Sequence, residues 1–459
     1  MFKLRKTKLI TLLLLAAAMV LAGLSCKFTT PALKEALKPV ELTWWGTYDD
    51  PQNFAEVIND YRALHPHISV TYRKLRPEEF ERELLNALAE DRGPDIFSLP
   101  NTWLTKYLPK IEPLPPKTKM AYVTSQKSLG LKEETITEIR ESSSLTAPQL
   151  KDGYLDVVYQ DAVRDGKIYG LPLSVDTLVL FYNRDLFNNA GLPLPPANWL
   201  DLQEQVKKLT YQDKNGNLIQ SGAALGTGVN VDRGVDILSL LMMQNGAQMT
   251  VGGQVTFGLV PANFPTPNYN PGLEAIRFYT DFAAPAKEVY TWNETFPNSL
   301  DAFAQGRVAM IFGYNYHIPY LEAKRSGKLN YAIAKAPQIE GRPEINFANY
   351  RVQVVSKKSR YVNEAWDFLQ FISRAAQARK YLAKTSQPAA LRALVAEQQA
   401  DDRLKIFADQ LLTSTSWYRG RDALAMEKTF SEMIDLIRQG GGLREIIELT
   451  TQKIQQTFY

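Results

Sequence analysis

The sequence contains VELTWWG at residues 40–46, PQNFAEVINDYRAL at 51–64, ISVTY at 68–72, PEEFERELLNALA at 77–89 and DIFSL at 95–99. The first, third and fifth stretches are short and rich in β-branched or aromatic residues, which predicts strands. The second and fourth begin with proline and repeat apolar residues every three or four positions, which predicts amphipathic helices. Strands and helices that alternate in this way predict βαβ units and a parallel sheet.

The order of these elements also predicts where a ligand would bind. In a sheet built from right-handed βαβ units, the carboxyl ends of the parallel strands lie at one edge, and loops at that edge form ligand sites. The loops after Trp45 and after Leu99 should therefore lie together. Topology alone thus predicts a ligand-binding edge beside the first and third strands.

The segment before this sheet has the organisation of an export signal. Residues 1–8 carry four basic residues and no acid, and residues 9–25 are 17 residues without a charge. A basic start, an apolar run and small residues at its end are the three parts of a secretory signal. A membrane span is the alternative, although a run of this length is at the short limit for crossing a bilayer. We interpret residues 1–25 as a signal peptide.

The composition limits the chemistry that the chain can perform. Its 459 residues include one cysteine and three histidines, which is too few for an intramolecular disulfide or a thiolate metal site. We therefore expect no metal and no cofactor. Removing the four basic residues of the leader from a total of 53 leaves 49, which equals the number of acidic residues. A neutral mature chain is not typical of nucleic-acid binding, so no such partner is expected.

The rest of the chain mixes helices, strands and turns. Residues 109–150 are rich in proline and then in Ser, Thr and Glu, which predicts a surface excursion with one or two helices. The DKNGN sequence at 213–217 is typical of a hairpin turn. A calcium loop is disfavoured there because the ladder of oxygen ligands and the closing glutamate are missing. From residue 363 to the end, the apolar spacing predicts mainly helices.

Seven short blocks carry a family resemblance. They are LTWWG at 42–46, GPDIF at 93–97, GKIYGLP at 166–172, LFYNRDLF at 180–187, NAGL at 189–192, AFAQGRVAM at 302–310 and EAWDFL at 364–369. In this order they resemble the extracellular solute-binding proteins of family 1, the carbohydrate receptors of ABC importers. Each block alone is weakly specific, but their order and spacing match the family over nearly all of the mature chain.

The single cysteine, Cys26, ends the stretch LAGLSC at residues 21–26. This stretch resembles the lipobox of bacterial lipoproteins, whose cysteine is lipid-modified and becomes the new N-terminus. Gly23 departs from the pattern, because the family usually has a larger aliphatic residue there. A buried free cysteine is the structural alternative. The resemblance implies a lipid-modified Cys26, a tether over residues 26–38 and an extracytoplasmic protein anchored to the membrane.

The family resemblance also implies an α/β fold of the two-lobed, periplasmic-binding-protein type II class. Each lobe would hold a mainly parallel sheet flanked by helices, and hinge strands would join the lobes. The first lobe would comprise residues 39–174 with 340–388, and the second 175–339 with 389–459. The protein would be a monomer and not an enzyme. It would close on a sugar or oligosaccharide and present it to the permease subunits of an ABC importer.

Sugar-binding sites combine flat aromatic rings, which cover the apolar faces of the sugar, with polar groups that bond its hydroxyls. Such side chains at predicted strand ends and at the turns that the family uses for ligand contact predict the ligand-binding residues Trp45, Tyr48, Asp49, Asn101, Trp103, Asp176, Trp292, Tyr314, Asn315, Tyr316, Tyr350, Arg351 and Trp417. The interpretation places Trp45, Asp176, Trp292 and Tyr314 in one crevice.

Several of these residues have structural alternatives. Trp44 and Trp45 point to opposite faces of a strand, so one of them belongs to the core. Asn101 could equally cap a helix, and Asp176 could form a cap or a hinge ion pair. Surface packing is the alternative for Tyr350, Arg351 and Trp417.

The sequence leaves other functions open. A glycosidase would need two carboxylates facing each other across the scissile bond, and the sequence has no nucleophile elbow, Walker loop or zinc-protease motif. The same fold could instead bind a polyamine, a phosphoryl compound or ferric iron. A sensor or adhesin lipoprotein without a transporter is a third possibility.

Overall fold

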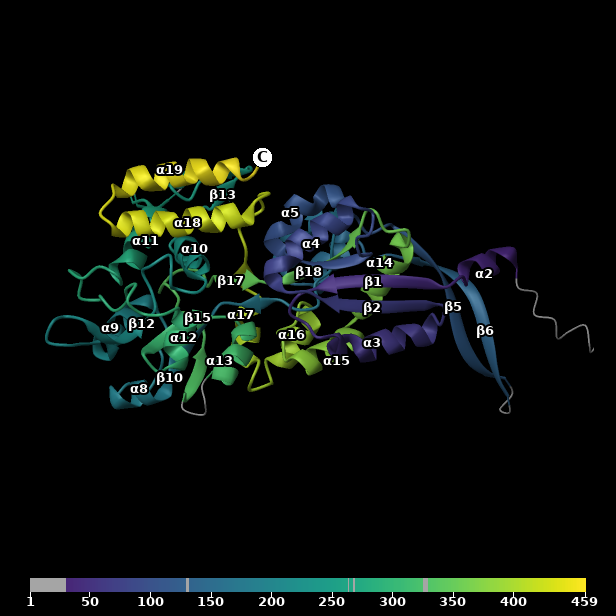
Figure 1. Cartoon of the computed structure of the whole chain (residues 1–459), viewed down its shortest axis with the longest axis horizontal. Helices are drawn as coiled ribbons and strands as arrows, with labels where there is room; N and C mark the ends of the chain where they lie inside the picture. The colour runs from purple at the N-terminus through teal and green to yellow at the C-terminus, as the bar shows by residue number, and fades with distance from the viewer. Residues whose placement is uncertain (1–29, 129–131, 263, 267–268, 325–328) are drawn as a thin grey trace, which may run out of the picture.

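The structure is a computed structural model that describes residues 30–128, 132–262, 264–266, 269–324 and 329–459. The expected signal peptide and Cys26 lie outside the described residues. Two lobes lie side by side along the long axis of the molecule, with β17 (Asn346–Asn349) between them (Figure 1). The expected two-lobed α/β class is confirmed.

The first lobe is built on a five-stranded sheet with the order β2-β1-β3-β18-β4. Its strands are β1 (Val40–Gly46), β2 (Ile68–Lys74), β3 (Ile96–Pro100), β4 (Ile111–Glu112) and β18 (Arg351–Ser356). The helices whose apolar faces cover it are α3 (Pro51–Leu64), α4 (Pro77–Ala89), α5 (Leu104–Tyr107), α6 (Ala147–Gly153), α7 (Asp156–Ala162), α14 (Val362–Ile372), α15 (Ala375–Thr385) and α16 (Arg392–Gln398). The strand–helix alternation predicted for residues 40–99 is therefore confirmed.

The second lobe has its own five-stranded sheet with the order β11-β12-β15-β10-β16. Its strands are β10 (Val179–Asn183), β11 (Tyr211–Gln212), β12 (Leu218–Ala223), β15 (Val308–Gly313) and β16 (Tyr331–Ala334). The helices of this lobe are α8 (Arg184–Asn189), α9 (Trp199–Leu209), α10 (Gly234–Gln244), α11 (Pro271–Asp281), α12 (Ser299–Ala304), α13 (Ile318–Lys324), α18 (Ala423–Arg438) and α19 (Leu443–Gln456).

The expectation of mainly parallel sheets is wrong in detail, because both sheets are mixed. In the first sheet β1 pairs in parallel with β2 and β3, whereas β18 is antiparallel to β3 and β4. In the second sheet only β12 and β15 pair in parallel. The reason is the connection between lobes: β18 and β10 enter their sheets from the crossing strands, so they run against neighbours that end at that edge.

Three short strands form a separate sheet between the lobes, in the order β19-β17-β9. They are β9 (Asp176–Thr177), β17 and β19 (Ser414–Thr415), and α17 (Lys405–Leu411) packs beside them. The apolar cores change near these strands. Val175 belongs to the first core and Leu178 to the second, while Phe347 belongs to the second and Ala348 to the first. Leu394 and Val395 also pack in the first core, so the last crossing lies after α16.

Residues 109–150, expected to form a surface excursion with one or two helices, are mainly β structure and contain the start of one helix, α6. They form a long antiparallel hairpin of β5 (Lys117–Ser128) and β6 (Lys132–Ser143), followed by α6. Figure 1 shows this hairpin beside α2 (Pro31–Ala36), at the end of the first lobe that faces away from the second lobe. The hairpin turn predicted at residues 213–217 is confirmed, since it joins the antiparallel strands β11 and β12.

Candidate ligand-binding cleft

A cavity of about 300 Å³ lies between the two lobes. The first lobe contributes side chains that follow β1 and β3 or begin β18, among them Tyr48, Asp49, Asn101, Thr102, Trp103 and Arg351. The second lobe contributes Arg233, Asp236, Ser239, Tyr316, Trp417 and Glu427. Because both lobes wall the cavity, a ligand bound there would contact both of them.

The backbone explains why these side chains meet. β1 ends at Gly46 and β3 ends at Pro100, and the chain then turns into a 3₁₀ helix over Asn101–Trp103. Arg351 pairs with Pro100 across the β3–β18 ladder, so it lies at the same edge of the sheet. The loops after the first and third strands therefore line one cavity, as the topology predicts.

The wall formed by the first lobe holds a positive charge among aromatic rings. The Arg351 Cζ atom lies 5.0 Å from the centre of the Tyr48 ring and 5.9 Å from that of Phe80. Tyr48 is 57% exposed, whereas Phe80 is buried. A guanidinium stacked on rings in this way gains from the negative faces of the rings, and its planar shape is held in place.

Asp49 lies in the same wall, but its carboxylate is hydrogen-bonded to other residues of the first lobe. Its Oδ1 atom accepts hydrogen bonds from the Tyr381 hydroxyl at 3.0 Å and from Asn53 Nδ2 at 3.3 Å. Burial raises the pKa of Asp49, while these hydrogen bonds and the positive charge of Arg351 oppose the rise. The carboxylate is thus a fixed acceptor that still faces the cavity.

The wall formed by the second lobe is an ion-pair network. Arg233 Nη2 lies 2.7 Å from Asp236 Oδ2 and 3.7 Å from Glu427 Oε1. The Tyr314 hydroxyl donates to the same Asp236 oxygen at 2.6 Å. Arg233 precedes α10 in a left-handed backbone conformation with φ of 55°, which places its side chain beside the first turn of that helix. The charge of Arg233 is therefore neutralised within its own lobe.

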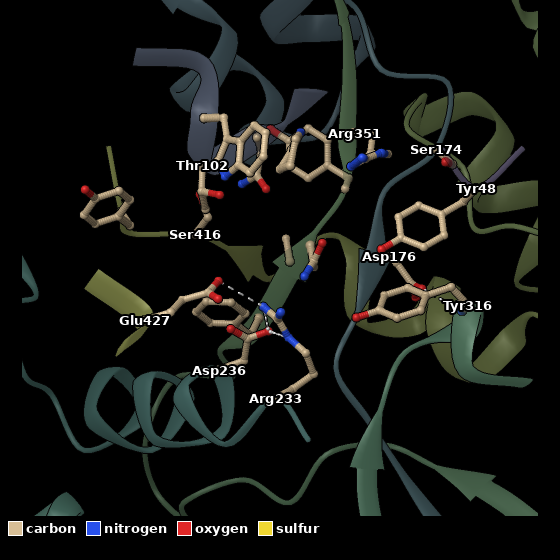
Figure 2. A pocket seen from close by; sticks show the side chains of 18 of the residues that line it. Tyr48, Thr102, Ser174, Asp176, Arg233, Asp236, Tyr316, Arg351, Ser416 and Glu427 are labelled. Atoms are coloured by element: carbon tan, nitrogen blue, oxygen red, sulfur yellow. Dashed lines mark hydrogen bonds and ion pairs between the residues drawn. The ribbon is translucent and has the colours of Figure 1, made fainter. Parts of the chain in front are cut away.

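Asp176 lies where the first crossing strand begins. Its carboxylate accepts the backbone N–H of Thr177 at 2.9 Å and that of Tyr316 at 3.4 Å. Burial raises the pKa of Asp176 to about 8, against the effect of these donors. Beside this residue the Tyr48 and Tyr316 rings face each other across the lobes with centroids 6.2 Å apart and planes inclined by 24° (Figure 2).

A second buried network holds the hinge. The carboxylate of Asp161, a residue that is 2% exposed, accepts hydrogen bonds from Asn101 at 2.9 Å, the Tyr350 hydroxyl at 2.9 Å and the Ser416 hydroxyl at 2.8 Å. Arg419 Nη2 lies 2.9 Å from the other carboxylate oxygen. The Asn101 amide and the Tyr350 hydroxyl are therefore already hydrogen-bonded to Asp161, although both residues line the cavity.

Nine of the residues expected at a ligand site line this cavity: Tyr48, Asp49, Asn101, Trp103, Asp176, Tyr316, Tyr350, Arg351 and Trp417. Four others do not line it, namely Trp45, Trp292, Tyr314 and Asn315. Of the four residues expected to share one crevice, the structure places only Asp176 there. Whether the nine contact a ligand stays a prediction.

The displaced residues have identifiable roles. Trp44 fills the core, and Trp45 on the opposite face of β1 packs under the Arg73 guanidinium at 4.8 Å. Trp292 is fully buried, stacks on Phe296 and donates to Asn230 at 2.9 Å.

The other two lie just behind the cavity. Tyr314 is buried and supports Asp236. Asn315 is buried at the start of a 3₁₀ helix that continues to His317.

The sequence did not point to Arg233, Asp236 or Glu427. Arg233 ends the loop that follows β12, and Asp236 lies in the first turn of α10, so the rule of strand ends could have found them. Glu427 belongs to α18, nearly 200 residues further along the chain, and no local pattern announces it. Among the described residues, no group of three or more His, Cys, Asp or Glu could hold a metal ion. None of the described helices is both long and apolar enough to span a membrane.

Comparison with known proteins gives a family match. The family model described as bacterial extracellular solute-binding protein matches residues 45–379, which is most of the chain. A putative binding protein of Brucella abortus is 24% identical over 156 residues. A galactooligosaccharide-binding protein of Bacillus subtilis is 27% identical over 234 residues. These alignments span 34% and 47% of this chain, and 32% and 48% of the respective relatives, so the chain spans less than half the length of either.

Solved structures share the fold over nearly the whole chain. A cyclo/maltodextrin-binding protein complexed with maltotetraose superposes with a TM-score of 0.68 at 16% identity, covering 92% of this chain and 99% of that protein. A solute-binding protein of an ABC transporter from Thermotoga lettingae, bound with α-D-tagatose, gives a TM-score of 0.65 at 17% identity and covers 92% of this chain and all of that protein. At these identities the likeness establishes the fold.

Proposed function

The chain belongs to the bacterial extracellular solute-binding protein family, and we propose that it captures a saccharide in the cleft between its lobes and delivers it to an ABC importer. The observation that carries the proposal is the composition of the cavity walls. Aromatic rings from both lobes, Tyr48 and Trp103 from one and Tyr316 and Trp417 from the other, surround carboxylate, amide and hydroxyl groups. Rings suit the apolar faces of a sugar, and the polar groups suit its hydroxyls.

The named ligands of similar proteins support the saccharide class. The Bacillus relative is named for galactooligosaccharides, and the solved structures with the same fold hold maltotetraose or tagatose. The protein would bind its ligand without changing it. A ligand that contacts both lobes favours the closed arrangement by its higher affinity for that state, and the three short strands between the lobes are the hinge.

The attachment to the membrane is part of the same proposal. The lipobox-like sequence at residues 21–26 would place a lipid on Cys26 after removal of the leader, and the protein would act as a monomer outside the cytoplasm. Metabolic labelling with a radioactive fatty acid tests this. Label should enter the native chain and be absent from the Cys26→Ala variant.

Isothermal titration calorimetry against a panel of mono- and oligosaccharides tests the ligand class. We expect at least one saccharide to bind and the Tyr48→Ala variant to weaken that binding at least tenfold, because the exposed ring lies at the mouth of the cavity. Tyr211→Ala is the matched control, since Tyr211 is 50% exposed and lies outside the cavity. Binding of a polyamine or ferric iron, with no response to any saccharide, would overturn the ligand class.

A further inference from the structure

The two arginines of the cleft differ in their surroundings. Arg233 is paired with Asp236 and Glu427. Arg351 forms no hydrogen bond or ion pair through its side chain with any other residue that the structure describes, and its Nε atom is buried without a partner. Figure 2 shows interaction lines that reach Arg233 on one wall, while Arg351 lies on the other wall beside Tyr48.

An unpaired guanidinium that is partly buried in a cavity is energetically unfavourable. Its charge loses hydration on burial, and the neighbouring rings of Tyr48 and Phe80 recover only part of that loss. Burial accordingly lowers the pKa of Arg351, although an arginine keeps its charge in proteins. A free energy cost of this kind is recovered when an anionic group binds, because the guanidinium can donate two parallel hydrogen bonds to a carboxylate.

Neither of the acids near Arg351, Asp49 and Asp176, forms an ion pair with its guanidinium. Asp49 is held by Tyr381 and Asn53 and does not come within ion-pair distance of the guanidinium. Asp176 accepts the backbone N–H groups of Thr177 and Tyr316 and forms no ion pair with Arg351. Arg351 therefore faces the cavity without a hydrogen-bonded acidic partner among the described residues, and Asp49 acts on its charge only at longer range.

From this arrangement we infer that the saccharide is acidic, and that Arg351 binds a carboxylate of a uronic acid residue in the cleft. The inference rests on the proposed saccharide-binding function and narrows it. A carboxylate fits better than a neutral hydroxyl because it accepts both guanidinium hydrogen bonds and neutralises the charge. The second lobe, with its neutralised Arg233, would contact the uncharged part of the sugar.

Calorimetric titration with matched ligands tests the inference. Galacturonic acid and its di- and trisaccharides are compared with galactose and the corresponding neutral oligosaccharides, and with the methyl esters of the uronates, which keep the shape but lose the charge. We expect at least one acidic ligand to bind at least tenfold more tightly than both its neutral and its esterified counterparts at pH 7. Glucuronate and glucose series extend the comparison to the other common stereochemistry.

Variants separate the charge of Arg351 from the fold. Arg351→Gln should abolish the preference for the acid while retaining binding of the neutral sugar, which also shows that the variant is folded. Arg73→Gln is the matched control, because Arg73 is in the same lobe, packs on Trp45 and lies outside the cavity. It removes the same charge and should leave the preference unchanged.

The outcomes are distinguishable. Equal or tighter binding of the neutral sugar by the native protein would overturn the acidic ligand and leave the saccharide receptor intact. An acid preference that persists in Arg351→Gln would overturn the role of Arg351. Absence of binding by every saccharide, neutral or acidic, would overturn both this inference and the proposed function.

Discussion

Each wall of the cleft contains an arginine, but only the second lobe neutralises its arginine with acids of its own. The second lobe neutralises Arg233 with Asp236 and Glu427, and the Tyr314 hydroxyl completes the network. The first lobe leaves Arg351 between rings without an ion-pair partner among the described residues. A wall that satisfies its own charges is preorganised and needs no ligand, whereas a wall with an unpaired charge gains stability when a ligand supplies the partner.

The largest expected effect comes from breaking the self-neutralised wall. Asp236→Ala removes the acceptor of the buried Tyr314 hydroxyl and the nearer acid of Arg233, which keeps only Glu427 at 3.7 Å, so the free energy of unfolding should fall by about 3–5 kcal/mol. Urea denaturation measures the change. Asp301→Ala is the control, since Asp301 bonds Tyr320 and Lys324 at the surface and its loss should cost less than about 1 kcal/mol. Equal losses of stability in both variants would show that the Arg233–Asp236 network contributes no more than a surface ion pair.

The two arginines themselves give the next contrast. Arg233→Met removes the cation from Asp236 and Glu427 and should lower the free energy of unfolding by about 2–3 kcal/mol, less than for a fully buried pair because the Arg233 side chain is 26% exposed. Arg351→Met should stay within about 1 kcal/mol of the native protein, since no ion pair is lost. A similar loss from both substitutions would mean that Arg351 is neutralised in solution.

A smaller effect is expected at the hinge. The pKa of Asp176 is higher in the folded protein, at about 8, than the ordinary value of 3.8, so the folded state holds a proton that the unfolded chain has released. Its contribution to stability is therefore complete below pH 4 and is lost as the pH rises towards 8. Asp176→Asn should flatten this part of the stability profile, measured by thermal unfolding between pH 4 and 9. An identical slope in both proteins would contradict the raised pKa.

The smallest effect is expected outside the cleft. Trp45→Leu should leave saccharide affinity within twofold of the native value, because Trp45 packs under Arg73 on a face of β1 that does not line the cavity. Titration calorimetry with a saccharide that the native protein binds provides the measurement. A tenfold loss would return Trp45 to the ligand site that the sequence suggested.

Sequence reasoning was most successful where local pattern determines topology. The alternation over residues 40–99 predicted the strands and helices, and the rule of strand ends predicted that Tyr48, Asn101 and Trp103 share an edge. It failed where contacts between distant parts of the chain determine strand direction and pairing. The strands that enter from the hinge are antiparallel to their neighbours, and the Ser-, Thr- and Glu-rich segment that follows the prolines forms the β5–β6 hairpin.

Single aromatic residues were the hardest to place. Trp292 lies in a polar stretch of sequence, yet its ring is fully buried against Phe296. The composition of a loop does not reveal whether its tryptophan turns inward, because that depends on what the rest of the lobe leaves unfilled. Glu427 and Asp161 show the reverse case, since tertiary contacts alone bring these acids to the cleft and the hinge.

The proposed function requires that the cavity between the lobes holds the ligand. A crystal structure of the full mature chain with the tightest-binding saccharide of the panel tests it most directly. We expect the sugar between Tyr48 and Tyr316, with contacts to both lobes and an acidic group against Arg351. A saccharide bound to one lobe alone, away from these side chains, would contradict it.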